Sequence, residues 1–157
     1  MKQFLTLKNV LKLGAALLAI IATILMFGSQ LSFTYVGDTT RHYIAYEDAL
    51  FGKYGSVLSF VGYLLMLIGG LVGILVAFTK TSDQIKKYIT IGVAVIVLTG
   101  AIFVFVEAAV YNNNVGKTYL TNPAQLAACP IIAGILGILA SLALAASEFV
   151  PDMQLVK

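Results

Sequence analysis

The sequence predicts an all-α membrane protein, an antiparallel left-handed bundle of four transmembrane helices with a small ordered extracellular cap. Of its 157 residues, 60% are hydrophobic and 11% are charged, whereas soluble domains average roughly 45–50% and roughly 25%. The apolar residues also gather in four long runs. A chain of this size cannot bury so much apolar surface in its own core, so lipid must cover the rest.

We expect one transmembrane domain over residues 1–157, with spans at 11–27, 57–78, 88–109 and 124–147. Residues 28–56 and 110–123 form the outer loops, and residues 79–87 form the cytoplasmic loop. The first run also resembles a secretory signal peptide, because lysines precede a short apolar stretch. Residues 27–31 offer no convincing pair of small residues at the A-x-A spacing of a cleavage site, which favours an uncleaved first span.

The lysines and arginines predict the orientation, because short loops rich in them stay in the cytoplasm. The N-terminal segment up to residue 12 holds three lysines, and Lys80, Lys86 and Lys87 lie in the loop 79–87. The longer loop 28–56 holds only Arg41 and Lys53. We therefore expect a multi-pass protein of the cell membrane with both termini in the cytoplasm. This distribution explains the net charge of +3, so no nucleic-acid partner is predicted.

Small residues recur along the spans at an average step of 3.5 residues, which is typical of closely packed membrane helices. The second and fourth spans show this best. The residues that we expect at helix contacts are Gly55, Gly62, Gly69, Gly73, Gly134, Gly137 and Ser141. The same spacing is also typical of surfaces that dock a second copy or another subunit.

Six of the eight tyrosines lie in or beside the outer loops. The alternation at residues 31, 33 and 35 predicts a strand, and Gly37-Asp38 predicts a turn. Thr39 or Thr40 is expected to cap a short helix that carries Tyr43, Tyr46 and Leu50. Asn122-Pro123 predicts the first residues of the fourth span.

Few residues are suited to chemistry, and we predict no enzyme, no catalytic residue, no metal site and no cofactor. His42 is the only histidine, without companions at metal-ligand spacing. Glu107 lies near the outer end of the third span, where Arg41 or Lys117 is its expected partner, unless it simply reaches headgroup water. The candidate interaction residues are Arg41, His42, Tyr43, Tyr46 and Glu107.

The centres of the four spans hold no ionisable residue, which argues against ion transport by one chain. The polar residues within the spans are suited either to lining a path for a neutral solute or to joining helices to one another. These residues are Thr23, Ser59, Tyr63, Thr99 and Ser141.

Four spans, cytoplasmic termini and a longer first outer loop resemble the claudin and tetraspan layout, in topology only. Claudin-like proteins carry a Trp and paired cysteines in that loop, whereas this chain has no Trp and one Cys. The lysine-led first span, the stripe from Gly55 to Gly73, and Lys86-Lys87 resemble small, mostly uncharacterised four-span proteins of low-GC Gram-positive bacteria.

The expected function is that of a scaffold, accessory or assembly subunit that presents a Tyr-rich outer surface. Its expected partners are the lipid bilayer and another membrane protein or further copies of itself. The alternative is a small transporter or channel-forming homo-oligomer, in which several copies enclose a path.

Overall fold

The computed structural model describes residues 6–35, 37–115, 123–151 and 153. The chain is mostly helical, and four helices are long and apolar enough to cross a membrane. They are α1 (Leu7–Ile24), α2 (Val57–Phe78), α3 (Asp83–Phe105) and α5 (Ala128–Ser147). A short 3-10 turn, η2 (Leu25–Phe27), continues α1, and helix α4 (Glu107–Val115) follows α3 after a break at Val106.

Hydroxyl side chains set the starts of the first two long helices. The Thr6 hydroxyl accepts a hydrogen bond from the backbone N–H of Asn9, and the Ser56 hydroxyl accepts one from Ser59. Each satisfies an amide that has no partner within its helix. The cap at Thr6 explains why α1 begins four residues before the expected start of the first span.

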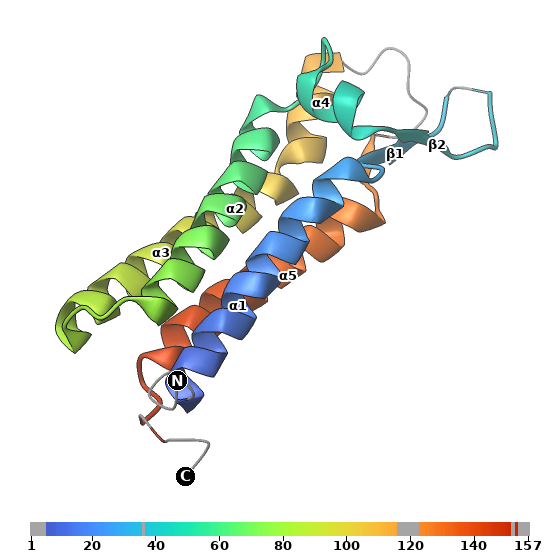
Figure 1. Ribbon diagram of the computed structural model, residues 1–157. Helices are drawn as coiled ribbons and strands as arrows, with labels where there is room; N and C mark the ends of the chain where they lie inside the picture. Colours follow the sequence, from blue (N-terminus) through green and yellow to red (C-terminus); the bar gives the residue numbers. More distant parts are fainter. Residues whose placement is uncertain (1–5, 36, 116–122, 152, 154–157) are drawn as a thin grey trace.

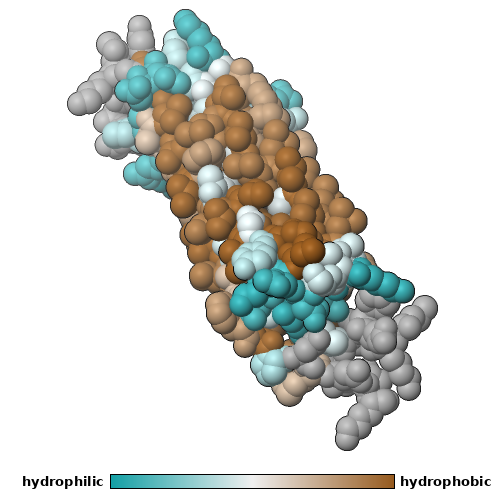
Figure 2. All heavy atoms as spheres, turned by 90° about the vertical axis from the view of Figure 1, so that its left-hand side faces the viewer, coloured by the Kyte–Doolittle hydropathy of each residue, from teal (hydrophilic) through white to brown (hydrophobic). Residues whose placement is uncertain are grey.

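The four long helices lie side by side along their lengths (Figure 1). The principal contacts join α1 to α2, α2 to α3, α3 to α5, and α5 back to α1. Their interior holds a few large buried side chains, such as Tyr63, Met66 and Leu144, among many small ones. Leu75 and Leu142 are at least 60% exposed on the outside. Figure 2 shows hydrophobic residues over the middle of the visible face and hydrophilic residues at both of its ends.

Glycine lets the helix backbones approach each other closely. A Cβ atom placed on Gly62 would lie 2.6 Å from the carbonyl oxygen of Gly100, and one on Gly100 would lie 2.5 Å from that of Gly62. A Cβ on Gly70 would lie 2.9 Å from the Ala16 oxygen, and one on Gly137 would lie 2.8 Å from the Ala101 Cβ. The contacts α2–α3, α1–α2 and α3–α5 therefore each depend on a missing side chain.

Hydroxyl groups join the same helices. Ser59 on α2 donates to the Phe103 carbonyl on α3 over 3.2 Å, and Ser141 on α5 donates to the Ala94 carbonyl on α3 over 2.8 Å. Thr23 on α1 donates to the Ala19 carbonyl of its own helix over 3.0 Å and also lies 3.4 Å from the Tyr63 carbonyl on α2. Thus Ser59 and Ser141 are engaged in helix contacts.

One end of the molecule carries what we call the cap, comprising residues 28–35, 37–56, 107–115 and 123–127 (Figure 1). Strand β1 (Leu31–Phe33) lies between β2 (His42–Ile44) and β3 (Gln125–Leu126), and both pairings are antiparallel. Leu31 faces Ile44 on one side and Leu126 on the other. A short helix with the wider π pattern, η3 (Glu47–Phe51), leads towards α2.

The cap corrects several expectations from the sequence. A small sheet accompanies the helices, so the class is not strictly all-α. Tyr43 lies in a strand rather than in a helix capped by Thr39 or Thr40, because residues 42–44 pair with β1. Pro123 does not open the last long helix, since residues 125–126 extend the sheet and α5 begins at Ala128. Asn122 lies outside the described residues.

Two further expectations are corrected near helix ends. Gly55 lies before α2 rather than at a helix contact, and its backbone N–H donates to the Gly52 carbonyl over 2.9 Å. A Cβ on Gly55 would lie 2.8 Å from the Leu50 carbonyl carbon, so the glycine serves the fold of the cap. The third span is interrupted at Val106, after which α4 forms part of the cap.

Alanine at Gly62 is expected to destabilise the protein by about 1–3 kcal/mol, because the new methyl group meets backbone that cannot yield easily. Gly92→Ala is the control, since nothing lies within 4 Å of its added Cβ. It should be neutral or slightly stabilising through helix propensity. The measurement is the midpoint temperature at which heating of the detergent-solubilised protein abolishes its monodisperse peak. Equal midpoints for both variants would contradict the close contact.

Leucine at Gly69 or Gly137 should prevent normal folding, because even a Cβ atom there collides with Val97 or with Met66 and Ala101. Yield and peak shape after membrane extraction measure this, with Gly92→Leu as the control. Normal yield of both variants would rule out the predicted packing.

Candidate functional site

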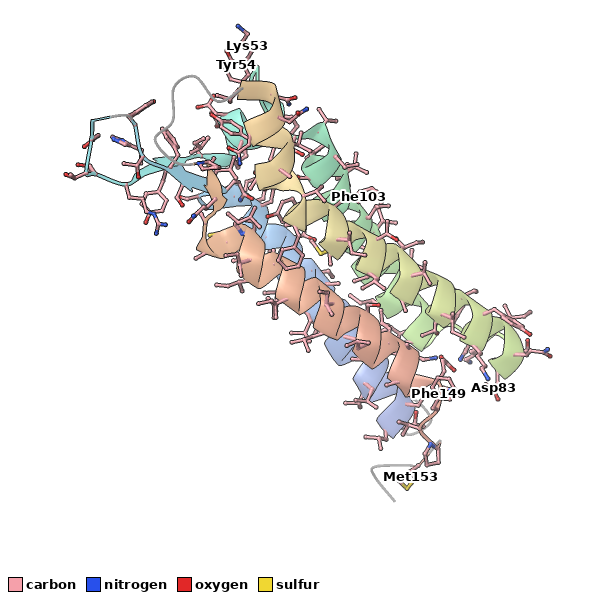
Figure 3. The ribbon with its side chains drawn as sticks, turned by 180° about the vertical axis from the view of Figure 1, so that it is seen from behind. Lys53, Tyr54, Asp83, Phe103, Phe149 and Met153 are labelled. Carbon is pink, nitrogen blue, oxygen red and sulfur yellow. The ribbon has the colours of Figure 1, made fainter. Side chains whose placement is uncertain are left out.

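The cap contains an open cleft of about 490 Å³, which we call the aromatic cleft. Its defining residues are Phe33, Tyr35, Tyr43, Tyr54 and Tyr111, together with the charged residues Asp48 and Lys53. Figure 3 places Lys53 and Tyr54 next to each other at the cap end, with Lys53 pointing away from the helices. The candidate site therefore lies in the cap and not between the four long helices.

Separate elements bring the aromatic rings together. Phe33 belongs to β1 with Tyr35 just after it, and their ring centroids are 4.8 Å apart with planes at 88°. Tyr54 precedes α2 and Tyr111 lies on α4, with centroids 6.4 Å apart and planes at 80°. Both distances lie in the usual range of edge-to-face pairs. Two nearly perpendicular pairs thus contribute to the cleft from different segments.

Charges of both signs lie at the cleft. Asp48 on η3 and Lys53 after it are both exposed. The Lys53 ammonium lies 5.2 Å from the centroid of the Tyr54 ring, within the range of a cation–π contact. Tyr43 is 61% exposed and Tyr35 is 47% exposed, so these rings are available to a partner.

His42 and Asp38 hold the loop beside the cleft. The Asp38 carboxylate lies 2.7 Å from His42 Nε2 and accepts the Thr40 backbone N–H over 2.9 Å. Gly37 has a φ of 85°, which glycine adopts readily, and this shapes the turn before Asp38. The hydrogen bonds from His42 and then from the Thr40 amide lower the pKa of Asp38 to about 2.

Aromatic contacts connect this turn to the cleft. The His42 ring stacks on Phe33 with centroids 5.8 Å apart and lies 5.1 Å from the Tyr35 ring. Tyr46 instead contacts Phe27 at the end of η2, with centroids 5.3 Å apart. Glu47 raises the pKa of the Tyr46 phenol by accepting its hydrogen bond. His42 and Tyr43 are therefore associated with the cleft, and Tyr46 joins the cap to α1.

Arg41 and Glu107 do not come together as the sequence suggested. Arg41 donates to the Gln125 side-chain oxygen over 3.2 Å and so links the loop to β3. Glu107 is fully buried, and neither of its carboxylate oxygens has a hydrogen-bond partner among the residues described. Its side chain is enclosed by protein rather than exposed at the surface. Lys117, its other expected partner, lies outside the described residues.

Gln30 was not among the residues singled out from the sequence, yet its side chain is fully buried where α1 meets the cap. Its amide nitrogen donates to the carbonyl oxygens of Leu25, Met26 and Gly28 at 3.2, 2.8 and 3.0 Å. Its amide oxygen accepts the Tyr63 hydroxyl from α2 over 2.8 Å. A lone Gln in a loop carries no sequence signal of this kind, because its partners are mostly backbone atoms.

A second polar cluster lies at the opposite end of the helices. Glu148, whose side chain is fully buried, lies 2.6 Å from the Lys12 ammonium and 2.8 Å from that of Lys8. Burial alone would raise the pKa of Glu148, but the hydrogen bonds from Lys12 and Lys8, with Thr90 beside them, lower it overall. This cluster ties the end of α5 to the start of α1.

Within the described ranges, no three His, Cys, Asp or Glu side chains gather as a metal site. No protein-family model matches the chain, and no curated protein or solved structure is significantly similar to it.

The titration of Asp38 is expected to have a midpoint of about 2 rather than its ordinary 3.8, because His42 and Thr40 stabilise the carboxylate. Since the folded pKa is the lower one, this stabilisation is fully present above pH 3.8 and is lost as the pH falls through 2. Carboxyl NMR shifts measure the midpoint. His42→Gln should raise it, and an unchanged midpoint in this variant would contradict the assigned cause.

Glu148→Gln should cost about 3 kcal/mol, because it leaves the buried Lys12 without its countercharge. Glu107→Gln is the matched control, since that carboxyl loses no described partner, and its effect should be clearly smaller. Thermal unfolding in detergent at neutral pH compares the two. A larger loss of stability in Glu107→Gln than in Glu148→Gln would contradict the roles assigned to these carboxylates.

Proposed function

We propose that the protein is an integral membrane scaffold, accessory or assembly subunit that presents its Tyr-rich cap to a partner on the outer side. The single observation that carries this proposal is the aromatic cleft, which lies at the cap end and is open to solvent. Protein interfaces are enriched in exposed aromatic rings of this kind, since Tyr buries much area at little cost in conformational freedom.

The proposal includes insertion of the four long helices as an antiparallel left-handed bundle. Their length, apolar composition and exposed aliphatic side chains support this. The lysines near α1 and between α2 and α3 support a cytoplasmic position for the end opposite the cap. With four spans, both termini then lie in the cytoplasm of a multi-pass protein of the cell membrane.

The helix contacts favour this function over that of a channel-forming homo-oligomer. The glycines that were candidates for docking further copies face neighbouring helices of the same chain: Gly69 meets Val97, and Gly73 meets Ala16. The hydroxyls of Ser59 and Ser141 are bonded to carbonyl groups on α3 rather than arranged along a path. The exposed aromatic and charged side chains of the cap are therefore a more specific indication of function than the helix surfaces are.

A photo-crosslinking residue at position 43 should form a discrete adduct with an unlike membrane or extracellular protein in native membranes, because Tyr43 is exposed at the cleft. The same residue at position 75 is the control, since Leu75 is exposed on the apolar side of α2 and should meet mainly lipid. Electrophoresis and mass spectrometry of the adducts provide the readout.

Adducts between copies of this chain from both positions, without an unlike protein, would contradict the proposed function. That outcome would favour the homo-oligomeric transporter or channel, and flux through liposomes would be the next measurement.

A further inference from the structure

The arrangement of rings in the aromatic cleft suits a positively charged ligand. Aromatic faces carry negative potential and attract ammonium groups within about 6 Å of the ring centroid. The pairs Phe33–Tyr35 and Tyr54–Tyr111 are each nearly perpendicular. Rings at right angles present faces in different directions, so a group in the cleft can contact more than one of them.

Asp48 adds a full negative charge to the same cleft. It is exposed, and no ion pair joins it to Lys53 in the described part of the chain. A carboxylate next to aromatic faces complements an ammonium group electrostatically and by hydrogen bonding. A neutral apolar ligand would leave that carboxylate without a partner.

Lys53 shows that one ring of the cleft already accepts an ammonium group. Its nitrogen lies 5.2 Å from the Tyr54 ring centroid, while the lysine itself stands at the rim and points away from the helices (Figure 3). The cleft retains a volume of about 490 Å³ beside it. Lys53 therefore does not fill the site, but its charge repels any second cation that binds there.

We propose that the aromatic cleft binds an alkylammonium group, supplied by a lysine side chain of the partner protein. This inference rests on the proposed function, whose partner chemistry it specifies. The methylene groups of the lysine lie against the rings of Phe33, Tyr35 and Tyr54, and its ammonium group pairs with Asp48. The volume also accommodates backbone on either side of the lysine, since ligand sites commonly measure about 300–1,000 Å³.

The test uses the full chain in nanodiscs with isotope-labelled tyrosines. The probe is the peptide acetyl-Gly-Lys-Gly-amide, and its control carries norleucine, which keeps the methylenes and removes the charge. We expect the lysine peptide to shift the NMR signals of Tyr35, Tyr54 and Tyr111. The norleucine peptide should bind about tenfold more weakly, as the loss of a cation–π contact and an ion pair implies.

Three variants assign the charges. Asp48→Asn should weaken binding of the lysine peptide about fivefold, and Lys53→Gln should strengthen it about twofold or more, because like charges repel. Lys80→Gln, at the far end of α2, removes the same charge outside the cleft and should leave the affinity unchanged. Opposite effects of Asp48→Asn and Lys53→Gln distinguish cation binding from a general loss of structure.

Equal binding of the norleucine peptide, or weaker binding in Lys53→Gln, would overturn the inference. Binding of choline or of a neutral saccharide without binding of the lysine peptide would also overturn it. An adduct from position 43 together with no preference for lysine leaves the proposed function standing and removes only the inference. Binding of the lysine peptide without a crosslink from position 43 to an unlike protein would contradict the proposed function. It would still support cation binding by the aromatic cleft.

Discussion

The buried amide of Gln30 is the interaction on which the position of the cap depends. Its side chain holds the last carbonyl groups of the first helix segment and receives the Tyr63 hydroxyl from α2. Its backbone N–H donates to Ile44 on β2, and its carbonyl accepts from Ala127 just before α5. Every polar atom of this residue has a hydrogen-bond partner. The residue therefore fixes the position of the sheet relative to the helices. The hydrogen bonds of Gln30 thereby also help to position the aromatic cleft.

Two buried carboxylates show how context decides the role of the same residue type. Glu148 has two ammonium groups beside it, so its charge is compensated. These ion pairs join the end of α5 to the first turns of α1. Glu107 has no described partner despite complete burial. An uncompensated carboxylate is costly in such surroundings. The carboxylate with paired ammonium groups therefore lies at the end opposite the cap, and the one without a described partner lies beneath the cap.

The spans could be predicted because their composition alone indicates length and position, and the periodic glycines indicated which faces would meet. Residues 31–33 were also predictable as a strand from their alternation. The partners of β1 were not, because residues 42–44 and 125–126 are too short to carry a pattern and pair through backbone atoms. For the same reason the tyrosines were recognised as a group, whereas their assembly with Asp48 and Lys53 in one cleft depends on contacts between distant segments.

The placement of β3 immediately before α5 has a consequence for the order of assembly. The same short stretch of chain completes the sheet beside β1 and leads into the helix that contacts both α1 and α3. During synthesis, this edge of β1 therefore has no partner until residues 125–126 have been made. The cap and the helix contacts thus both depend on the last quarter of the chain, and a chain without that quarter lacks a strand of the sheet as well as the helix that contacts α1 and α3.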